Sequence, residues 1–436
     1  MDKIVIEGGK PLFGEVFVSG AKNAVLPILF ASLLTDEECV FENVPQLKDV
    51  ATVLRLLKEF GVDVKNDGRT IRVRARTIEK PFATYDLVKT MRASVLALGP
   101  LLARAGRAHV ALPGGCAIGA RPINLHLQAL TKLGADMALS EGYVVAQAKK
   151  LTGTTIYFET STVTGTENIL MAACLAIGTT IIENAAQEPE VIDLANCLNS
   201  MGAEIEGAGT SKITVKGKTS LKGCHYTIMP DRIEAGTYAV AAVATQGDVI
   251  IRNCEPEHLQ ALLTKLSDSG AHIEVPNPKS IRVRAFERPR SFKLQTEPYP
   301  GFATDMQAQM MALASVALGT SALVENIFEN RFMHVCELQR MGAHIEVKGS
   351  MALVQGRENL IGAPVMATDL RASVCLVIAG LVARGKTEIH RVYHLDRGYE
   401  KLEEKLLKLG ANIMRVPEHV TTLKMEGMAS PQEIVH

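Results

Sequence analysis

The apolar positions of the chain follow a pattern that recurs about every seventy residues. One short signature marks each repeat: two residues, a glycine, usually an alanine, and then a polar and an apolar residue, as in "KLGADM" and "KLGANI". The signature occurs six times, at Gly61, Gly134, Gly202, Gly270, Gly342 and Gly410. The chain is therefore built from six copies of one unit.

Each unit is predicted to contain two helices and several strands. About 25 residues before each glycine lies an alternating, β-branched stretch such as "TTIIEN", which predicts a strand. Apolar residues then recur at spacings of three and four, as in "EVIDLANCLNSMGAEI", and predict an amphipathic helix. The glycine fits the C′ position after this helix, where φ is positive. A further alternating segment such as "TIRVRA" predicts another strand, and a nearly uncharged stretch such as "ILMAACLAI" predicts a buried helix.

No such unit can bury its apolar helix alone, so the units should pack around shared centres. We therefore expect an α/β (α+β) fold in which six units divide into two groups of three. An open solenoid is the alternative, but the chain lacks the shorter and stricter period typical of solenoids.

Length and charge restrict the possible functions. A chain of 436 residues is expected to form two or more domains. Lys and Arg together number 47, as do Asp and Glu, so no net field favours nucleic acid or an anionic membrane. The start, "MDKIVIEGGK", lacks the features of a signal peptide, and the apolar runs are shorter than the ~20 residues of a membrane span. We expect a cytoplasmic protein.

The eight cysteines show no C-x-x-C pair and no metal-type spacing with histidine, so we expect reduced thiols. Four of them, Cys39, Cys174, Cys197 and Cys375, stand in apolar strands or helices and are expected to be small buried residues. Cys116 differs because it lies in the glycine-rich segment "PGGCAIGARP". Glycines let such a loop approach a ligand or act as a lid, and Arg121 offers a planar fork for phosphate or carboxylate. In this setting a thiol can serve as an acid or a nucleophile.

Other candidates stand at the starts of predicted helices, where free N–H groups and the helix dipole favour anions. Lys22 and Asn23 in "SGAKNAVLP" precede an apolar helix, and Arg397 in "HLDRGYEK" precedes another. Equivalent helix starts in other units carry Arg92, Asp305, Asp369 and Arg371. For the two aspartates ordinary N-capping is an equally good interpretation. Several arginines at helix starts, however, predict a cleft that gathers negative charge.

These segments carry a resemblance to a known family. The chain resembles the UDP-N-acetylglucosamine 1-carboxyvinyltransferases, which are enolpyruvyl transferases, from Met1 to about residue 420. The matching segments include "GAKNAVLP", "MRASVLALGPLLAR", "PGGCAIGARP", "MPDRIEAGTYA", "FATDMQAQ" and "DLRASVCLVIAGL". The resemblance implies a two-domain inside-out α/β barrel, in which each domain contains three βαβαββ units. One domain would comprise residues 22–229 and the other residues 1–21 with 230–423, leaving 424–436 as a polar tail.

The family reaction transfers the enolpyruvyl group of phosphoenolpyruvate to the 3′-hydroxyl of the nucleotide sugar and releases phosphate. The resemblance makes Cys116 the acid and Asp305 the base, while Lys22, Arg121 and Arg397 hold phosphoenolpyruvate. It assigns Asn23, Arg92 and the backbone near Ile327 to the nucleotide sugar. It places Asp369 and Arg371 along the cleft, and Asp231 near the domain crossover. No metal, redox cofactor, nucleic acid, membrane or oligomer is required.

Two segments depart from the common family pattern. Asn124 in "RPINL" stands where many members have an acidic residue, and residues 160–168, "TSTVTGTEN", also differ. Both differences concern contacts to the nucleotide. The alternatives are the related 3-phosphoshikimate 1-carboxyvinyltransferase, which shares the fold and the chemistry, and a non-enzymatic ring of repeats.

Overall fold

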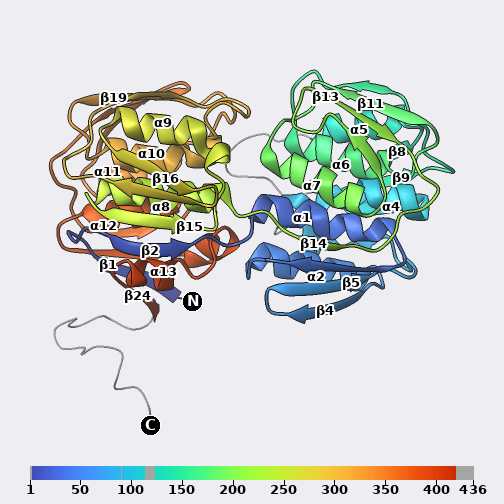
Figure 1. The fold of residues 1–436 in the computed structure, drawn as a ribbon, viewed down its shortest axis with the longest axis horizontal. Helices are drawn as coiled ribbons and strands as arrows, with labels where there is room; N and C mark the ends of the chain where they lie inside the picture. The colour runs from blue at the N-terminus through green and yellow to red at the C-terminus, as the bar shows by residue number, and fades with distance from the viewer. Residues whose placement is uncertain (1, 90, 113–122, 419–436) are drawn as a thin grey trace, which may run out of the picture.

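The chain forms two globular lobes that lie side by side (Figure 1). The structure, a computed structural model, describes residues 2–89, 91–112 and 123–418. Lobe I is defined here by the hydrophobic core between Ala21 and Met229. Lobe II is defined by a second core, which combines Ile4–Val18 with Ile233–Ile413.

Each lobe contains three four-stranded sheets with one shared plan. In lobe I the strand orders are β14-β3-β5-β4, β6-β7-β9-β8 and β10-β11-β13-β12. In lobe II they are β16-β17-β15-β2, β18-β19-β21-β20 and β22-β23-β1-β24. In every sheet one parallel pair is extended by two antiparallel strands, as β10 and β11 are by β13 and β12. The predicted six units in two groups of three are confirmed.

The strands are short, and several of them alternate between buried and less buried positions. Those of lobe I are β3 (Glu38–Glu42), β4 (Asp63–Asp67), β5 (Thr70–Arg74), β6 (Phe82–Ala83), β7 (Arg107–Ala111), β8 (Asp136–Ser140), β9 (Tyr143–Gln147), β10 (Thr155–Tyr157), β11 (Thr179–Glu183), β12 (Glu204–Glu206), β13 (Lys212–Lys216) and β14 (His225–Thr227). Those of lobe II are β1 (Asp2–Glu7), β2 (Phe13–Phe17), β15 (Asp248–Arg252), β16 (His272–Asn277), β17 (Ser280–Arg284), β18 (Lys293–Gln295), β19 (Thr320–Val324), β20 (His344–Lys348), β21 (Met351–Gln355), β22 (Pro364–Met366), β23 (Lys386–His390) and β24 (Asn412–Pro417).

Two sets of helices lie inside and between the sheets. The inner set comprises α1 (Lys22–Ala31), η2 (Arg92–Ala97) with α4 (Leu98–Ala105), α6 (Val163–Ala173), α8 (Arg232–Ala244), η4 (Thr304–Met306) with α10 (Gln307–Ala314), and α12 (Val374–Val382). The outer set comprises α2 (Lys48–Glu59), α5 (Asn124–Lys132), α7 (Pro189–Ser200), η3 (Pro256–Leu259) with α9 (Gln260–Asp268), α11 (Val335–Arg340), and η5 (Val392–Arg397) with α13 (Leu402–Lys408). Two short helices, η1 (Ser32–Leu34) and α3 (Tyr85–Val88), complete the list.

The inner helices fill the centre of each lobe, as their small number of charged residues predicts. Helices α8, α10 and α12 pack against one another in lobe II, and every residue of α10 is buried. The six repeat glycines follow the outer helices with φ between 87° and 105°, which confirms their predicted C′ position.

The chain passes between the lobes twice, and the two connections pair with each other. The first strands of the chain belong to lobe II, because β1 lies between β23 and β24 and β2 runs parallel to β15. The chain then enters lobe I at residues 19–22 and returns at residues 229–231. Gly20 forms a bridge with Pro230, and the Ala21 N–H donates to the Met229 carbonyl at 2.7 Å. The starts of α1 and α8 are thereby held side by side.

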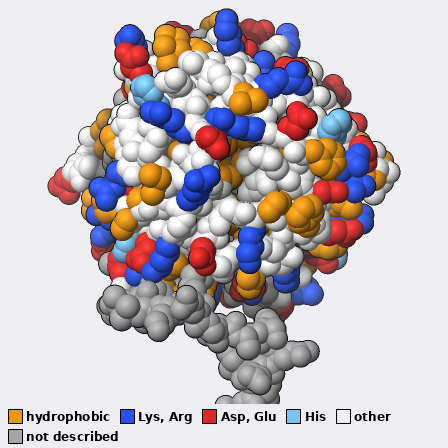
Figure 2. Space-filling view, turned by 90° about the vertical axis from the view of Figure 1, so that its left-hand side faces the viewer, with side chains coloured by type: hydrophobic (Ala, Val, Ile, Leu, Met, Phe, Trp, Pro, Cys, Tyr) orange, Lys and Arg blue, Asp and Glu red, His pale blue; other side chains and the backbone are white. Residues whose placement is uncertain are grey.

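The surface carries both signs of charge. Figure 2 shows the outer face of lobe II, where Lys and Arg side chains are interspersed with Asp and Glu and the hydrophobic groups are small and separate. Within the described part of the chain, no helix has both the length and the apolar character needed to cross a membrane.

Candidate active site

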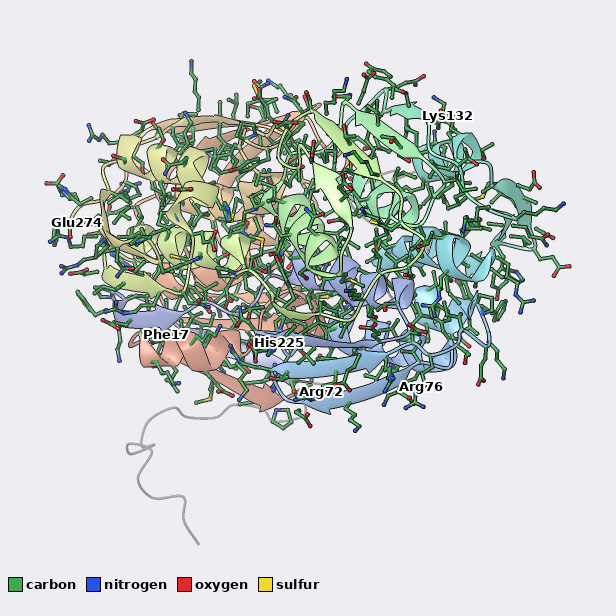
Figure 3. The ribbon with its side chains drawn as sticks, turned by 45° about the vertical axis from the view of Figure 1, so that its right-hand side comes forward. Phe17, Arg72, Arg76, Lys132, His225 and Glu274 are labelled. Carbon is green, nitrogen blue, oxygen red and sulfur yellow. The ribbon has the colours of Figure 1, made fainter. Side chains whose placement is uncertain are left out.

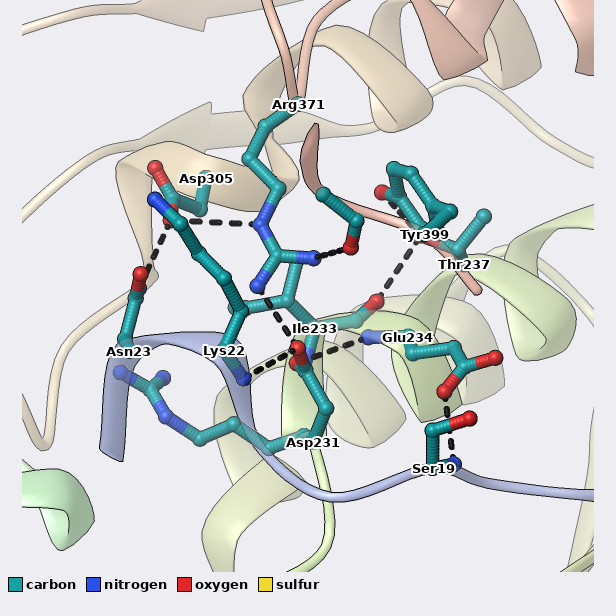
Figure 4. A network of polar contacts seen from close by, with 12 residues as sticks. Ser19, Lys22, Asn23, Asp231, Ile233, Glu234, Thr237, Asp305, Arg371 and Tyr399 are labelled. Atoms are coloured by element: carbon teal, nitrogen blue, oxygen red, sulfur yellow. Dashed lines mark hydrogen bonds and ion pairs between the residues drawn. The ribbon is translucent and has the colours of Figure 1, made fainter. Parts of the chain in front are cut away.

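The paired connections between the lobes place a buried aspartate at the centre of a polar network (Figure 4). Asp231 caps α8, since its Oδ1 accepts hydrogen bonds from the N–H groups of Ile233 at 2.8 Å and Glu234 at 3.1 Å. Its Oδ2 accepts from the Lys22 N–H at 3.3 Å and from Arg371 at 2.7 Å. One carboxylate therefore links the starts of α1 and α8 to the loop before α12.

Arg371 is a buried cation whose guanidinium is engaged by the protein. The residue is 1% exposed, and it donates to the Gly398 carbonyl at 2.7 Å as well as to Asp231. Its Nε lies 3.9 Å from Oδ2 of Asp305. Burial alone would lower the pKa of Arg371, but the nearby carboxylates outweigh burial and raise it. Arg371 thus holds Asp231 and faces Asp305 as a permanent positive charge.

Asp305, the predicted base, lies in η4 and contacts both lobes. Its Oδ1 accepts from Arg331 at 2.6 Å, and its Oδ2 accepts from the Asn23 side-chain amide of lobe I at 3.3 Å. Burial would raise the pKa of Asp305, but Arg331 and Arg371 outweigh it and hold the pKa below its ordinary value. The carboxylate is therefore ionised at neutral pH.

The two predicted phosphoenolpyruvate ligands that the structure describes share one carboxylate. Asp49, in the first turn of α2, lies 3.3 Å from the Lys22 ammonium and 2.8 Å from Nε of Arg397. Arg397 belongs to lobe II and Asp49 to lobe I, so this ion pair joins the lobes. Burial, followed by the positive charges of Arg371 and Arg397, lowers the pKa of Lys22, while Asp49 opposes the shift.

Arg331, which the sequence analysis did not name, also belongs to the site. Arg331 is 4% exposed and donates to the Thr304 hydroxyl at 2.9 Å as well as to Asp305. The Thr304 hydroxyl donates in turn to Glu325. Asp49 and Arg331 were missed because each is a single charged residue outside the quoted motifs, and no local pattern marks its partner.

The remaining predicted residues are distributed around this centre. Glu325 accepts from the Ile327 N–H at 2.9 Å, so that donor is already used within the protein. Asp369 accepts from the N–H groups of Arg371 at 2.9 Å and Ala372 at 2.7 Å, so it caps the turn that leads into α12, a role close to the N-capping that its sequence position allowed. Arg92 begins η2 and lies near His126, where burial and then the arginine's charge lower the histidine pKa to about 4.

The lid candidates cannot be placed against these residues. Cys116 and Arg121 lie outside the described residues, as does the predicted tail 424–436. Both departures from the family pattern lie at the starts of described helices: Asn124 begins α5, and Thr162 caps α6 by accepting from the Gly165 N–H at 3.2 Å.

Cations and carboxylates of both lobes meet at the centre. Lys22, Arg331, Arg371 and Arg397 pair with Asp49, Asp231 and Asp305. Glu325 and Asp369 add negative charge near Arg331. The buried cations are therefore balanced by carboxylates of the protein. No group of three or more His, Cys, Asp or Glu side chains among the described residues is arranged to hold a metal ion.

Comparison with known proteins decides the family. The family model described as EPSP synthase (3-phosphoshikimate 1-carboxyvinyltransferase) matches residues 6–406. The chain belongs to this family. Solved structures agree, since the enolpyruvyl transferase NikO from Streptomyces tendae superimposes with a TM-score of 0.85 at 26% identity over 95% of this chain and 99% of that one. An EPSP synthase from Acinetobacter baumannii gives 0.75 at 16% identity over 96% and 100%, which shows the fold alone. The expected enolpyruvyl transferase fold is confirmed.

Curated relatives within the family are much more similar. A protein from Desulfosudis oleivorans is 58% identical over 416 residues, which cover 95% of this chain and all of the relative. Proteins from Geotalea daltonii and Myxococcus xanthus are 56% and 57% identical, over 96% and 95% of this chain and 100% and 99% of their own length. All three are named UDP-N-acetylglucosamine 1-carboxyvinyltransferase.

Proposed function

We propose that the chain is a UDP-N-acetylglucosamine 1-carboxyvinyltransferase. It transfers the enolpyruvyl group of phosphoenolpyruvate to the 3′-hydroxyl of UDP-N-acetylglucosamine and releases phosphate, in the first committed step of peptidoglycan synthesis. The observation that carries this proposal is the 56–58% identity to relatives of that name over nearly the whole of both chains. The enzyme acts in the cytoplasm on two small-molecule substrates, with no metal, redox cofactor or oligomer required.

The same observation separates this activity from that of 3-phosphoshikimate 1-carboxyvinyltransferase. The EPSP synthase of known structure shares only 16% identity with the chain, and fold likeness at that level does not carry function. The Cys116 segment adds to the distinction, because it belongs to the motifs that resemble the nucleotide-sugar enzymes.

Substrate anions would be held by cations drawn from both lobes. Lys22 of lobe I and Arg397 of lobe II both contact the Asp49 carboxylate, which lies between them. A phosphate or carboxylate of phosphoenolpyruvate would share these cations with Asp49 or displace it, with Arg121 as the third ligand. Asn23, Arg92 and the backbone near Ile327 would contact the nucleotide sugar, and Asp369 would line the cleft.

The chemistry needs an acid for C3 of phosphoenolpyruvate and a base for the sugar hydroxyl. We assign the acid to Cys116 and the base to Asp305, whose ionised state suits it to accept a proton. Attack of the hydroxyl on C2 gives a tetrahedral ketal, which loses phosphate. Arg371 and Asp231 are positioning residues, since the first is buried against the second and neither carries a free charge. Arg331 restrains the base in the same way.

Phosphate release tests the proposal directly. Purified protein with phosphoenolpyruvate should release phosphate when UDP-N-acetylglucosamine is added, and EDTA should leave the rate unchanged. Release with 3-phosphoshikimate in place of the nucleotide sugar would favour the alternative transferase. Loss of activity in EDTA, restored by one divalent ion, would contradict a mechanism that rests on these side chains.

A further inference from the structure

Three cysteines from distant parts of the chain meet on the inner side of β14. Cys224 directly precedes β14, and the pairing of His225 with Val40 places Cys224 beside Cys39 on β3. On the same face of β14, the Tyr226 hydroxyl donates to Asp193 of α7 at 2.7 Å. Residues 224 and 226 share a strand face, and residues 193 and 197 share a helix face, so Cys224 meets Cys197. These three residues are called the cysteine cluster below.

Cys224 is the hub of the cysteine cluster. Its thiol interacts with the thiols of Cys197 and Cys39 and with the Ser200 hydroxyl. Cys224 is partly exposed, whereas Cys39 and Cys197 are both fully buried. Figure 3 shows the neighbouring residue His225 at the surface, on the same side of the molecule as Arg72 of that sheet. Adjacent strand residues face opposite sides, so Cys224 lies behind His225, and it is the most exposed residue of the cysteine cluster.

The chemical roles of the three thiols follow from this arrangement. Hydrogen bonds from Cys197 and Cys39 outweigh burial and lower the pKa of the Cys224 thiol. The same contacts, together with burial, raise the pKa values of Cys39 and Cys197. Of the three thiols, that of Cys224 is therefore the most readily ionised.

The other described cysteines lack this arrangement. The thiols of Cys174 and Cys254 donate to carbonyl groups of their own segments, and both side chains are buried. Cys375 is buried within the apolar helix α12, and Cys336 is exposed on α11. These residues provide internal controls. Among the described residues, the cysteine cluster included, no group of three or more His, Cys, Asp or Glu side chains is arranged to hold a metal ion.

We propose that Cys224 is a peroxide-reactive thiol whose oxidised form is captured by Cys197 or Cys39 as an intramolecular disulfide. The Cys224 thiolate attacks one oxygen of hydrogen peroxide, the O–O bond breaks, and the leaving hydroxide takes a proton to become water. The sulfur of Cys197 or Cys39 then attacks Sγ of the Cys224 sulfenic acid. The S–O bond breaks, and the departing hydroxyl leaves as a second water with the proton of the attacking thiol. A dithiol reductant reverses the link.

The location gives the disulfide a structural consequence. Helix α7 carries Glu190 in its first turn, where it pairs with Arg232 of lobe II at 2.9 Å, and β14 leads into the connection at Asp231. A link from Cys224 to Cys197 would fasten these two elements together, and one to Cys39 would fasten β14 to β3. The inference does not depend on the proposed function, because none of the three cysteines is assigned to the reaction.

Peptide mapping without reduction tests the proposal. The full chain is treated with hydrogen peroxide at neutral pH, remaining thiols are alkylated, and a tryptic digest is examined by mass spectrometry. Trypsin releases Cys224 in peptide 223–232, Cys197 in 151–212 and Cys39 in 23–48. We expect a pair joining 223–232 to one of the other two peptides, which disappears after treatment with dithiothreitol. Fragmentation separates Cys197 from Cys174 within peptide 151–212.

Variants give the matched controls. Cys224→Ser should reduce the cross-linked fraction at least tenfold, whereas Cys254→Ser should leave it unchanged. In Cys39→Ser/Cys197→Ser the hydroxyl groups can still donate hydrogen bonds to Cys224 but cannot form a disulfide, so the sulfenic acid on Cys224 should persist and be trapped by dimedone. If a variant fails to fold, dimedone trapping on the wild-type chain at short times gives the same information about Cys224. The proposal is overturned if no linked peptide contains Cys224, or if oxidation modifies Cys336 or Cys116 and leaves Cys224 unchanged.

Discussion

Asp49 occupies the position between the cations that are proposed to bind phosphoenolpyruvate. It is 3% exposed and lies between Lys22 and Arg397, the two described cations assigned to phosphoenolpyruvate. An incoming anion must therefore compete with a carboxylate that is already in place. This arrangement keeps both cations paired until substrate arrives, which avoids the cost of burying an unpaired charge.

Replacement of Cys116 tests its role as the acid. Cys116→Asp should retain measurable turnover, because a carboxyl in a closed cleft can present a proton near neutral pH. Cys116→Ser should lose at least about 100-fold in turnover, since a serine hydroxyl is a far weaker acid. Steady-state phosphate release from folded variants gives the comparison. Full activity in the serine variant would exclude Cys116 as the acid.

Arg331→Gln tests Asp305 as the base through the pH profile. Arg331 helps to hold the pKa of Asp305 below its ordinary value, so its removal should raise that pKa toward the ordinary value. A base works only when deprotonated. The acidic limb of kcat/KM should therefore move to higher pH. Arg340→Gln, which removes an exposed arginine from α11, should leave the limb in place. An unmoved limb in Arg331→Gln would show that Asp305 is not the titrating base.

The two connecting segments are the elements that position the site. Gly20 and Pro230 pair where the chain crosses between lobes, and Asp231 binds the start of α1 directly after this bridge. Gly20 has no room for a side chain, because a Cβ there would lie 1.8 Å from the Asn43 carbonyl oxygen. Close backbone approach at the crossing thus depends on this glycine.

Gly20→Ala should destabilise the protein by about 3 kcal/mol or more, since a backbone carbonyl cannot rotate away from the added methyl group. Gly142→Ala is the matched control. Its Cβ would meet nothing within 4 Å, so only the positive φ of 80° opposes the change, at about 1–2 kcal/mol. Thermal unfolding followed by circular dichroism should show the larger fall in Tm for Gly20→Ala. Equal falls in Tm for the two variants would mean that the backbone at Gly20 can move away from the Asn43 carbonyl without loss of stability.

The elements were largely predictable from the sequence, whereas their long-range contacts were not. A glycine after an amphipathic helix is a local signal, and all six repeat glycines adopt the predicted conformation. The family resemblance alone implied that residues 1–21 join the later part of the chain. The place of β1 between β23 and β24 was not predicted, because pairing across nearly the whole chain leaves no local pattern. Asp49 and Arg331 were missed for the same reason. The role of Asp369, by contrast, was predictable, because a position at a predicted helix start suits the capping of the turn that its carboxylate makes before α12.

Across the whole molecule, ion pairs join the lobes around the site. Arg397 pairs with Asp49, Arg232 with Glu190, and Arg69 with Glu400, each within 2.9 Å. The Asn23 amide adds a hydrogen bond to Asp305. Residues proposed to hold one substrate therefore come from both lobes, so closure of the lobes and substrate binding should be coupled.

Asp49→Asn should weaken the contact between the lobes in the absence of ligand. Small-angle scattering should show a radius of gyration larger than that of the wild type, by roughly 1 Å on about 22 Å expected for this chain length. UDP-N-acetylglucosamine should reduce the radius for the wild type. Asp268→Asn, on the exposed side of α9, should match the wild type throughout. If UDP-N-acetylglucosamine leaves the radius of gyration of the wild type unchanged, the lobes do not close on binding it.

The mass of the product formed from phosphoenolpyruvate and UDP-N-acetylglucosamine shows directly whether the enolpyruvyl group is transferred. We expect the nucleotide sugar to gain one enolpyruvyl group for each phosphate released, and an analogue lacking the 3′-hydroxyl to gain none. Phosphate release without a heavier nucleotide sugar, or transfer to 3-phosphoshikimate instead, would contradict the proposed function.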